Sequence, residues 1–450
     1  MTKLVPQTYK NLVIGFGKGG KTLAGFLAKQ NESVAIIEQS AKMYGGSCIN
    51  IACIPTKSLI IQAEKNIEYQ EAYKTKEALT SNLRQKNFDK IDGLENATVI
   101  TGKASFVSEN EVRVTLPDGG EIQLTAERLF INTGTLPVIP PLEGIDSPRV
   151  YTSRTIMEQQ QKPGELIIIG GGFIGLEFAD MFAKFGSKVT VLDNQESFLP
   201  KEDEDISKEV FKVLTEKSIQ IISNVLVEKL EDIDSDSIRA WFLQNGQRKS
   251  INANAVLIAT GRKPNTEGLN LQAAGIETDE RGFVKVDEQL KTSVPHIWAI
   301  GDINGGSQFT YISLDDFRVI KNQITGNADY TSLEARKPYP TCVFISPPLA
   351  QAGLREKEAK EKGYSVKIAT LQANSIPKAA ILNEKRGILK AVIDADTNKI
   401  LGCTLFCAEA HELINTVQLA MNAGLTYDIL RDAIYTHPSM TEALNDLFGN

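Results

Sequence analysis

Asn11-Leu-Val-Ile-Gly15-Phe-Gly17-Lys-Gly19-Gly20 is the stretch that decides the fold of this chain. An apolar strand pattern runs into Gly-x-Gly-x-x-Gly, and a helical pattern of apolar residues follows. The first glycine permits a tight turn, the second lets a pyrophosphate approach the backbone, and the third lets helix and strand pack closely. The N-terminus of the helix faces the phosphates with its partial positive charge. The stretch therefore predicts a strand–turn–helix unit that binds a dinucleotide.

The next strand pattern, Ser33-Val-Ala-Ile-Ile-Glu38, ends on an acid that lies 18 residues beyond Gly20. An acid at this distance is expected to accept hydrogen bonds from the ribose of the dinucleotide. A lone glycine pattern is weak evidence, but here strand, helix and acid all have the expected spacing.

A second unit with the same layout is Glu165-Leu-Ile-Ile-Ile-Gly170-Gly-Gly172-Phe-Ile-Gly175, and its acid, Asp193, follows 18 residues after Gly175. Two units in one chain predict two dinucleotides, of which FAD and NAD(P)H are the simplest pair. Asp193 would bind a ribose 2′-hydroxyl and repel a 2′-phosphate, and no Arg stands in residues 194–199. We therefore expect NADH to be preferred over NADPH.

The bulk properties are those of a soluble globular protein of several domains. The chain has 450 residues, of which 42% are hydrophobic and 23% charged, with a net charge of -7 and no basic run. This balance argues against nucleic acid as a partner. The apolar stretch near the N-terminus is too short for a signal peptide or a membrane span, so we expect a cytoplasmic protein without a membrane partner.

A close cysteine pair lies between the two units, in Gly45-Gly46-Ser47-Cys48-Ile-Asn-Ile-Ala-Cys53-Ile-Pro55-Thr56-Lys57. Residues five apart in a regular helix rise about 7.5 Å, whereas a disulfide needs Cα atoms roughly 4.4–6.8 Å apart. The pair can therefore bridge only where the helix is distorted, and Lys57 supplies a positive charge near a thiolate. Two unconnected buried cysteines, or half of a zinc site, are the alternatives.

The remaining cysteines fit no second site. Cys403 and Cys407 lie in a strand-like stretch, where residues four apart are about 13 Å from each other, too far to share a metal ion. We interpret them, together with Cys342, as small buried hydrophobic residues, and we expect no metal site.

The stretch around Cys48 and Cys53 resembles the redox motif of the flavoprotein disulfide reductases, which include glutathione reductase, dihydrolipoamide dehydrogenase and mercuric reductase. The resemblance covers the whole chain. It continues in four further motifs: Asn132-Thr133-Gly134-Thr-Leu-Pro137, Ala259-Thr-Gly261-Arg-Lys-Pro-Asn265, Trp298-Ala-Ile-Gly301-Asp302 and Thr436-His437-Pro438-Ser-Met-Thr-Glu442. The fold it implies is α/β, with two Rossmann-like dinucleotide-binding domains and an α+β C-terminal dimerisation domain.

The resemblance implies a homodimer with a shared active site, with FAD and NADH, or NADPH, as cofactors. Cys53 would be the thiol beside the flavin, and Cys48 the interchange thiol that meets the substrate. Lys57 and Glu177 would pair near flavin N5. His437, oriented by Glu442, would act as acid–base partner from the other subunit.

The cofactor-binding residues are then expected in two groups. The FAD group is Gly15, Gly17, Gly20, Glu38, Gly46, Ser47, Lys57, Thr133, Gly134, Gly301 and Asp302. The NADH group is Gly170, Gly172, Phe173, Gly175, Asp193 and Gly261. In the second group, Phe173 stands where relatives often have a Tyr that gates the nicotinamide pocket.

Details of the sequence are similar to the reactive-chlorine-resistance flavoproteins, among them Gln308-Phe-Thr-Tyr-Ile-Ser-Leu-Asp-Asp-Phe-Arg318. This branch is implicated in reducing hypothiocyanous acid to thiocyanate in oxidative-stress defence. Reduction of copper(II) or mercury(II), or of a small disulfide or dihydrolipoamide-type substrate, is the alternative. The chain lacks the N-terminal Cys-rich domain and the C-terminal vicinal cysteines of mercuric reductases, and it keeps His437. Asp193 disfavours glutathione reductase, and Tyr435 replaces a His of the dihydrolipoamide dehydrogenase motif. A non-enzymatic, flavin-bound redox sensor is the third hypothesis.

These motifs divide the chain into an FAD domain at 1–151 and 267–336, an inserted NAD(P)H domain at 152–266, and an interface domain at 337–450. A long polar helix is expected around residues 62–86. The acidic run Glu202-Asp-Glu-Asp205 is expected to be a solvated helix start.

Overall fold

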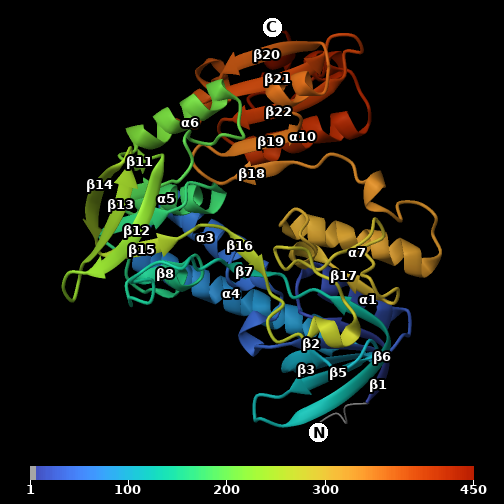
Figure 1. Cartoon of the computed structure of the whole chain (residues 1–450). Helices are drawn as coiled ribbons and strands as arrows, with labels where there is room; N and C mark the ends of the chain where they lie inside the picture. Colours follow the sequence, from blue (N-terminus) through green and yellow to red (C-terminus); the bar gives the residue numbers. More distant parts are fainter. Residues whose placement is uncertain (1–6, 450) are drawn as a thin grey trace. The chain divides into compact units, whose positions relative to one another are not determined.

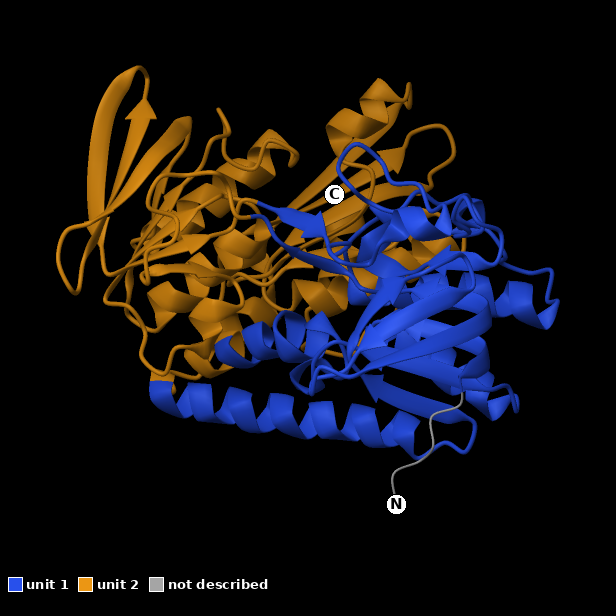
Figure 2. Ribbon diagram, turned by 60° about the horizontal axis from the view of Figure 1, so that its bottom comes forward, with its two compact units in different colours: residues 1–59, 70–138, 261–336 blue, residues 60–69, 139–260, 337–450 orange. Residues whose placement is uncertain are grey.

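The computed structural model describes residues 7–449. The chain forms two compact units, shown in separate colours in Figure 2. Unit 1 holds residues 70–138 and 261–336 with the described part of residues 1–59, and unit 2 holds residues 60–69, 139–260 and 337–450. The three-domain division expected from the motifs stays a prediction.

The core of unit 1 is a seven-stranded sheet with the strand order β3-β2-β1-β6-β5-β4, in which β17 also pairs with β6 (Figure 1). Four of its strands run parallel to one another: β1 (Thr8–Ile14), β2 (Val34–Glu38), β3 (Ala97–Thr101) and the end of β6 (Glu121–Ile131). The strands β4 (Lys103–Phe106) and β5 (Glu111–Thr115) extend the sheet antiparallel, and β17 (Ile297–Ala299) is parallel to β6. Val34–Glu38 is buried at every position, as a parallel strand covered on both faces requires.

Helices cover this sheet. The helix α1 (Lys18–Lys29) packs against β1, β2 and α7 (Thr310–Thr325). The long polar helix is observed, but at different bounds from those expected. A helix α3 (Cys53–Glu64) ends before Asn66, which has a φ of 56°, and α4 runs from Tyr69 to Asp92. The expected span of 62–86 was therefore wrong, because a left-handed residue divides that stretch into two helices.

Unit 2 contains a second parallel sheet with the order β11-β10-β9-β15-β8. Its strands are β8 (Val150–Thr152), β9 (Glu165–Ile169), β10 (Lys188–Leu192), β11 (Gln220–Ile222) and β15 (Ala255–Ile258). The helix α5 (Phe173–Lys184) follows β9 directly and packs against β9 and β10. An antiparallel meander of β12 (Val225–Asp232), β13 (Ile238–Gln244) and β14 (Gln247–Ala253) is inserted before β15.

The C-terminal part of unit 2 is an antiparallel five-stranded sheet with the order β18-β19-β22-β21-β20. Its strands are β18 (Thr341–Val343), β19 (Leu349–Gly353), β20 (Val366–Gln372), β21 (Ile388–Asp394) and β22 (Ile400–Phe406). The helices α10 (Ala410–Asn422) and α12 (Ala443–Gly449) pack against it. Cys403 and Cys407 are buried in this core, as expected, whereas Cys342 is only half-buried.

The acidic run lies at the start of α6 (Glu204–Glu216), as expected, but it is only partly solvated. Glu202 accepts two hydrogen bonds from Arg355, at 2.7 and 2.9 Å. The buried ammonium of Lys390, on β21, lies 3.2 Å from Asp203 and 3.0 Å from Asp205. The run is thus an ion-pair connection within unit 2, because cations more than 150 residues later in the sequence meet it.

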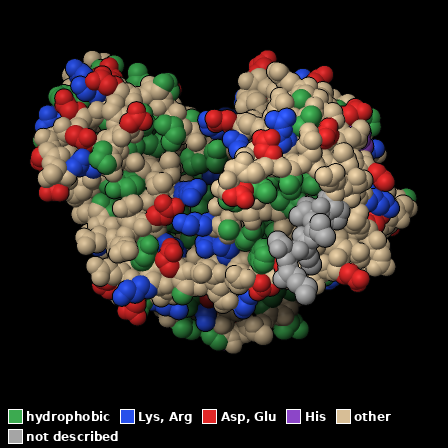
Figure 3. Space-filling view, turned by 90° about the horizontal axis from the view of Figure 1, so that it is seen from below, with side chains coloured by type: hydrophobic (Ala, Val, Ile, Leu, Met, Phe, Trp, Pro, Cys, Tyr) green, Lys and Arg blue, Asp and Glu red, His purple; other side chains and the backbone are tan. Residues whose placement is uncertain are grey.

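No helix among residues 7–449 is long and apolar enough to cross a membrane. On the face shown in Figure 3, basic and acidic side chains occur together with apolar ones between them. No single sign of charge covers that face.

Candidate functional site

The first glycine turn is built as its sequence predicts. Gly15 has a φ of +103°, and a Cβ there would lie 2.3 Å from the carbonyl oxygen of Asn132. A Cβ on Gly20 would lie 2.9 Å from the carbonyl oxygen of Gly15 and from a methyl of Val13. Only glycine fits the first position without strain, and only a residue without Cβ lets α1 approach β1 this closely.

Asn132 holds this turn from the end of β6. Its side-chain oxygen accepts a hydrogen bond of 2.9 Å from the backbone N–H of Gly20, and its Nδ2 donates to the carbonyl oxygen of Ile300 at 2.6 Å. The same oxygen would lie 2.5 Å from a Cβ on Gly17. Asn132 opens one of the four further motifs of the resemblance, but its role was not predicted. A buried amide at the end of an apolar strand was the available signal.

Glu38 lies at the carboxyl end of β2, where the sequence placed it. Its carboxylate accepts hydrogen bonds from the backbone N–H groups of Phe16, at 3.1 Å, and Ser40, at 3.3 Å. Burial raises the pKa of Glu38 to about 7, although these backbone donors oppose the rise. A buried acid beside the glycine turn fits a ribose, whose hydroxyls can donate to it.

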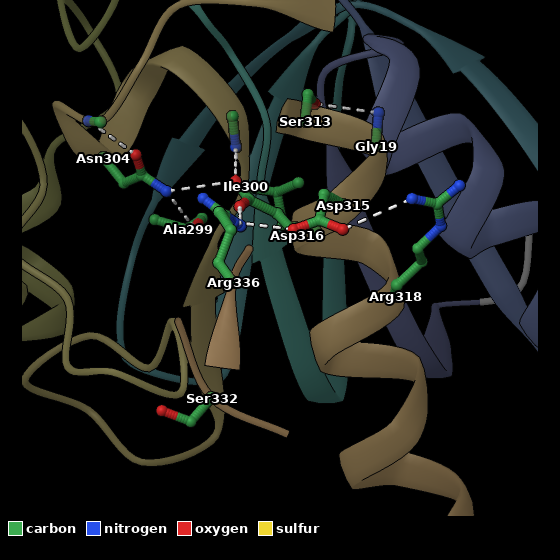
Figure 4. A network of polar contacts seen from close by, with 12 residues as sticks. Gly19, Ala299, Ile300, Asn304, Ser313, Asp315, Asp316, Arg318, Ser332 and Arg336 are labelled. Carbon is green, nitrogen blue, oxygen red and sulfur yellow. Dashed lines mark hydrogen bonds and ion pairs between the residues drawn. The ribbon is translucent and has the colours of Figure 1, made fainter. Parts of the chain in front are cut away.

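A second group of polar atoms surrounds the end of β17. The backbone N–H of Gly301 donates to Asp316 at 2.7 Å, and Asp316 is held by Arg336 at 2.5 Å and by Asn304 at 3.3 Å (Figure 4). The same figure shows Gly19 of α1 donating to Ser313 of α7, at 3.1 Å. Side chains of α7 thus fix both the Gly301-Asp302 turn and α1, so the two expected FAD motifs share one support.

Asp302 is linked to β7 (Thr135–Pro137). The hydroxyl of Thr135 donates to Asp302 at 3.1 Å, and Arg262 donates to the hydroxyl and the carbonyl oxygen of Thr135, both at 2.7 Å. Burial raises the pKa of Asp302, and the charge of Arg262 opposes the rise. Thr133 carries a buried hydroxyl oxygen without a hydrogen-bond partner, and a Cβ on Gly134 would meet nothing within 4 Å. An orphaned hydroxyl beside open backbone is what a bound cofactor would satisfy.

The cysteine pair lies where the helix is broken, as the spacing required. The helix α2 covers Ser47–Asn50, and α3 starts at Cys53. Both cysteines are thiols and half-buried. A Cβ on Gly46, which has a φ of +77°, would lie 2.7 Å from the Cα of Gly17. The redox loop therefore packs directly on the first glycine turn, and a dinucleotide bound at that turn would lie close to the thiols.

The two thiols have different acidities. The S–H of Cys48 donates to Cys53, which lowers the pKa of Cys53 and raises the pKa of Cys48. The hydroxyl of Thr310, at the start of α7, lies 3.5 Å from the sulfur of Cys53, and the charge of Lys57 lowers the pKa of Cys53 further. Cys53 is thus the more acidic thiol of the pair, and Cys48 keeps its proton more strongly.

Thr310 was quoted in the sequence, but without a role. It lies 257 residues from Cys53 in the chain, so no local pattern could have connected them. Lys21, the residue directly after the third glycine, was also passed over, and its contacts with the redox loop are described below.

The second glycine turn, in unit 2, has the same backbone as the first. Gly170 has a φ of +114°, and its Cβ would lie 2.5 Å from the carbonyl oxygen of Ala259. A Cβ on Gly175 would lie 2.0 Å from the carbonyl oxygen of Gly170. Gly172 differs from its counterpart because a Cβ there would meet nothing within 4 Å.

The other residues expected to bind NADH differ from one another in their surroundings. The carboxylate of Asp193 lies against Gly171, 2.6 Å from the position of a Cβ on that glycine. Phe173 is partly exposed at the start of α5. Glu177 accepts a hydrogen bond of 3.0 Å from the backbone N–H of Phe344 within unit 2. Gly261 has a φ of +124° and no atom near its Cβ position.

His437 and Glu442 form the pair that the resemblance implied. Nδ1 of His437 lies 2.7 Å from a carboxylate oxygen of Glu442, and the histidine side chain is 71% exposed. The other carboxylate oxygen of Glu442 is buried and has no hydrogen-bond partner. The geometry leaves Nε2 of His437 available to a group outside this chain.

Comparison with known proteins gives the same assignment along nearly the whole chain. Residues 9–316 match the family model described as pyridine nucleotide-disulphide oxidoreductase, and residues 339–448 match the dimerisation domain of that family. The chain is 44% identical over 442 residues to the pyridine nucleotide-disulfide oxidoreductase RclA of Escherichia coli, covering 98% of this chain and 99% of RclA. A mercuric reductase of Bacillus cereus is 33% identical, covering 97% of this chain and 70% of that protein.

The solved structures agree. The structure of the HOCl-induced flavoprotein disulfide reductase RclA from Escherichia coli superposes with a TM-score of 0.93, covering 98% of this chain and 99% of RclA at 44% identity. A Cu(II) complex of RclA superposes with a TM-score of 0.95, covering 99% of both chains. The predicted fold class is confirmed, and this chain belongs to the pyridine nucleotide-disulphide oxidoreductase family.

Proposed function

We propose that this protein is an FAD-dependent NADH oxidoreductase that reduces a small reactive oxidant, hypothiocyanous acid, through Cys48 and Cys53. The observation that carries the proposal is the thiol pair itself. It lies at a helix break on the first glycine turn, and the pKa of Cys53 is lowered whereas that of Cys48 is raised. The likeness to RclA, described as HOCl-induced, favours a reactive oxidant as substrate.

The residues of unit 1 fit FAD. The turn of Gly15, Gly17 and Gly20 would hold the pyrophosphate, Glu38 a ribose, and the Gly301-Asp302 turn the ribitol chain. When bound, FAD supplies two-electron transfer between a nicotinamide and the thiol pair. The chain's own contribution is to fix Cys53 as a thiolate, through Thr310, Lys57 and the Cys48 thiol.

Cys48 and Cys53 would reduce the oxidant in two steps. Cys48 loses its proton to a base as it attacks the sulfur of hypothiocyanous acid, and a Cys48–thiocyanate mixed species and hydroxide form. The Cys53 thiolate then attacks the sulfur of Cys48, which gives the disulfide and releases thiocyanate. The oxidant gains two electrons and the two cysteines lose them. His437 of the partner subunit, oriented by Glu442, is proposed to act as the acid–base group. A positioned base of this kind contributes about 10²–10⁴-fold to the rate.

In unit 2, we propose that the second glycine turn binds NADH, with Asp193 at the ribose 2′-hydroxyl. Phe173, at the start of α5, would border the nicotinamide. We also propose a cytoplasmic homodimer. Its interface would use the residues that match the dimerisation domain, where Leu419 is 69% exposed and Ile434 fully exposed. Side chains of this kind exposed on one chain indicate a surface that a second copy covers.

The test is steady-state NADH oxidation by the purified flavoprotein with hypothiocyanous acid, oxidised glutathione, lipoamide, mercury(II) and copper(II) as acceptors. Fast turnover with hypothiocyanous acid, reduced on the order of 10³-fold or more in Cys48→Ser, supports the proposal. Cys342→Ser is the matched control, because that thiol is also half-buried but lies in the C-terminal part of unit 2. Fast turnover with lipoamide or glutathione alone would overturn the choice of substrate.

Metal-ion reduction is the second candidate, favoured by the Cu(II) complex of RclA and by the mercuric reductase relative. Among residues 7–449 no three His, Cys, Asp or Glu side chains gather in a way that could hold a metal ion. Copper(II)-dependent NADH oxidation that survives in Cys48→Ser would favour this candidate over the thiol mechanism.

A further inference from the structure

Lys21 connects three segments of unit 1. It lies on the first turn of α1, and its ammonium donates to the side-chain oxygen of Asn87 on α4 and to the carbonyl oxygen of Gly45, at 3.5 Å. Gly45 opens the loop that carries Cys48. Lys21 also interacts electrostatically with Cys48 itself. The ammonium is therefore held by two neutral acceptors at the start of the redox loop, within electrostatic range of Cys48.

Lys21 has no carboxylate partner among the described residues 7–449. The charged groups that face it are Lys18 on the same helix, Lys90 on α4 and the Cys48 sulfur in the redox loop. Two of these three are cations. A half-buried cation among other cations normally needs a counter-charge, because an unpaired buried charge is costly. The Cys48 thiolate, or an anion bound next to it, is the group that would supply one.

Lys21 and Cys48 affect each other's pKa in opposite directions. Burial is the largest effect on Lys21 and, with Lys18 and Lys90, lowers its pKa to about 8. The positive charge of Lys21 lowers the pKa of Cys48, against the larger opposing effects of Cys53 and burial. Lys21 is thus charged below about pH 8 and loses its charge as the pH rises through that value.

We propose that Lys21 is an anion-binding residue at Cys48, whose ammonium holds a small pseudohalide anion of the thiocyanate class against the Cys48 sulfur. The inference rests on the proposed function and names the group that recognises the substrate. Asn87 and the Gly45 carbonyl act as positioning groups, because they fix the ammonium at the start of the redox loop.

Each chemical step places negative charge where Lys21 can stabilise it. As Cys48 loses its proton for the attack, negative charge develops on its sulfur. When the S–OH bond of hypothiocyanous acid breaks and the Cys48–S bond forms, hydroxide leaves. When Cys53 attacks Cys48, the Cys48–SCN bond breaks and thiocyanate departs with the electron pair. A cation beside Cys48 favours both the thiolate and the departing thiocyanate.

The first experiment measures binding without turnover. In the flavin-bound Cys53→Ser variant, alkylation of Cys48 by iodoacetamide is followed by the mass of its peptide, with and without sodium thiocyanate. We expect thiocyanate to slow alkylation at pH 7 and to protect about tenfold less well when Lys21→Met is added, since a charge-assisted hydrogen bond is lost. The ratio of rates with and without thiocyanate removes the titration of Cys48 itself.

The matched variants separate charge from structure. Lys21→Arg keeps the charge and should keep most of the protection, and Lys29→Met, at the exposed end of the same helix, should keep all of it. In the protein with Lys21, protection should fall as the pH rises through about 8. Lys21→Gln replaces Lys21→Met if the latter does not fold. Equal protection by thiocyanate with Lys and with Met or Gln at position 21 would overturn the inference.

Turnover then distinguishes this inference from the proposed function. With hypothiocyanous acid, Lys21→Met in the protein with both cysteines should raise KM more than it lowers kcat. If the unsubstituted protein does not turn over hypothiocyanous acid but Lys21-dependent protection by thiocyanate remains, the substrate is wrong and the anion site stands. If turnover is fast and unchanged in Lys21→Met, the function stands and the role of Lys21 is contradicted.

Discussion

The two glycine turns are nearly identical in sequence but constrained by different surroundings. Gly15 and Gly170 have almost the same φ, +103° and +114°, and in each case a Cβ would strike the carbonyl oxygen of a neighbouring strand end. The middle glycines differ. A Cβ on Gly17 would strike the side chain of Asn132, whereas a Cβ on Gly172 would reach open space. In the first turn the chain's own packing requires glycine, and in the second only an approaching nucleotide can require it.

The largest expected effect comes from Gly17→Ala. The added methyl must displace the side-chain oxygen of Asn132, which binds Gly20, so we expect a loss of about 1–3 kcal/mol in the free energy of unfolding and weak flavin retention. Gly172→Ala should leave the free energy of unfolding within about 0.5 kcal/mol and raise the KM for NADH at least tenfold. Denaturant unfolding, flavin absorbance after gel filtration and NADH kinetics measure these quantities.

A double variant sharpens the comparison. In Asn132→Ala the obstacle is removed, so adding Gly17→Ala to it should cost less than Gly17→Ala costs alone. Strictly additive effects, or equal destabilisation by Gly17→Ala and Gly172→Ala, would contradict the difference between the two turns.

The acid of the first turn gives a pH dependence. The pKa of Glu38 is raised to about 7 in the folded protein by burial, whereas an ordinary Glu has a pKa of about 4.3. Its contribution to stability is therefore complete below the ordinary value and is lost as the pH rises through about 7. The flavin-free protein should lose on the order of 2 kcal/mol more between pH 5 and pH 8 than Glu38→Gln does.

Denaturant unfolding at the two pH values measures this difference. Glu109→Gln, an exposed position in the same unit, is the control and should follow the unsubstituted protein. Parallel pH profiles for Glu38→Gln and the unsubstituted protein would show that Glu38 is not the titrating group.

The smallest expected effect concerns the acid of the second turn. Asp193→Ser removes the negative charge that faces the ribose position beside Gly171. We expect kcat/KM for NADPH, relative to NADH, to rise about tenfold, which corresponds to about 1.4 kcal/mol, while flavin retention stays unchanged. Glu196→Ser, three residues later and exposed, is the matched control. An unchanged preference would remove Asp193 from the 2′-hydroxyl site.

Much of the fold could be predicted because its signals are local. The strand that ends at Ile14, the glycine turn and α1 follow from a continuous apolar run, from positions that need a positive φ and from helical periodicity. The break between Cys48 and Cys53 followed from spacing alone. The long helix predicted around 62–86 exists but starts only at Tyr69, because the left-handed conformation of Asn66 is a single-residue feature that periodicity does not record.

Local sequence patterns were enough to predict two glycine turns, each followed by a strand that ends on an acid, and a thiol pair in an irregular helix start, because these features depend on backbone geometry within about 20 residues. The groups that surround the glycine turns and the thiol pair are set by tertiary packing. Thr310 on Cys53, Asn132 on Gly20 and Lys21 with Asn87 at the redox loop come from segments 66 to 257 residues apart. Such contacts are set by how helices and strands pack, so the acidity of the thiols and the charge beside Cys48 could not be predicted from the motifs.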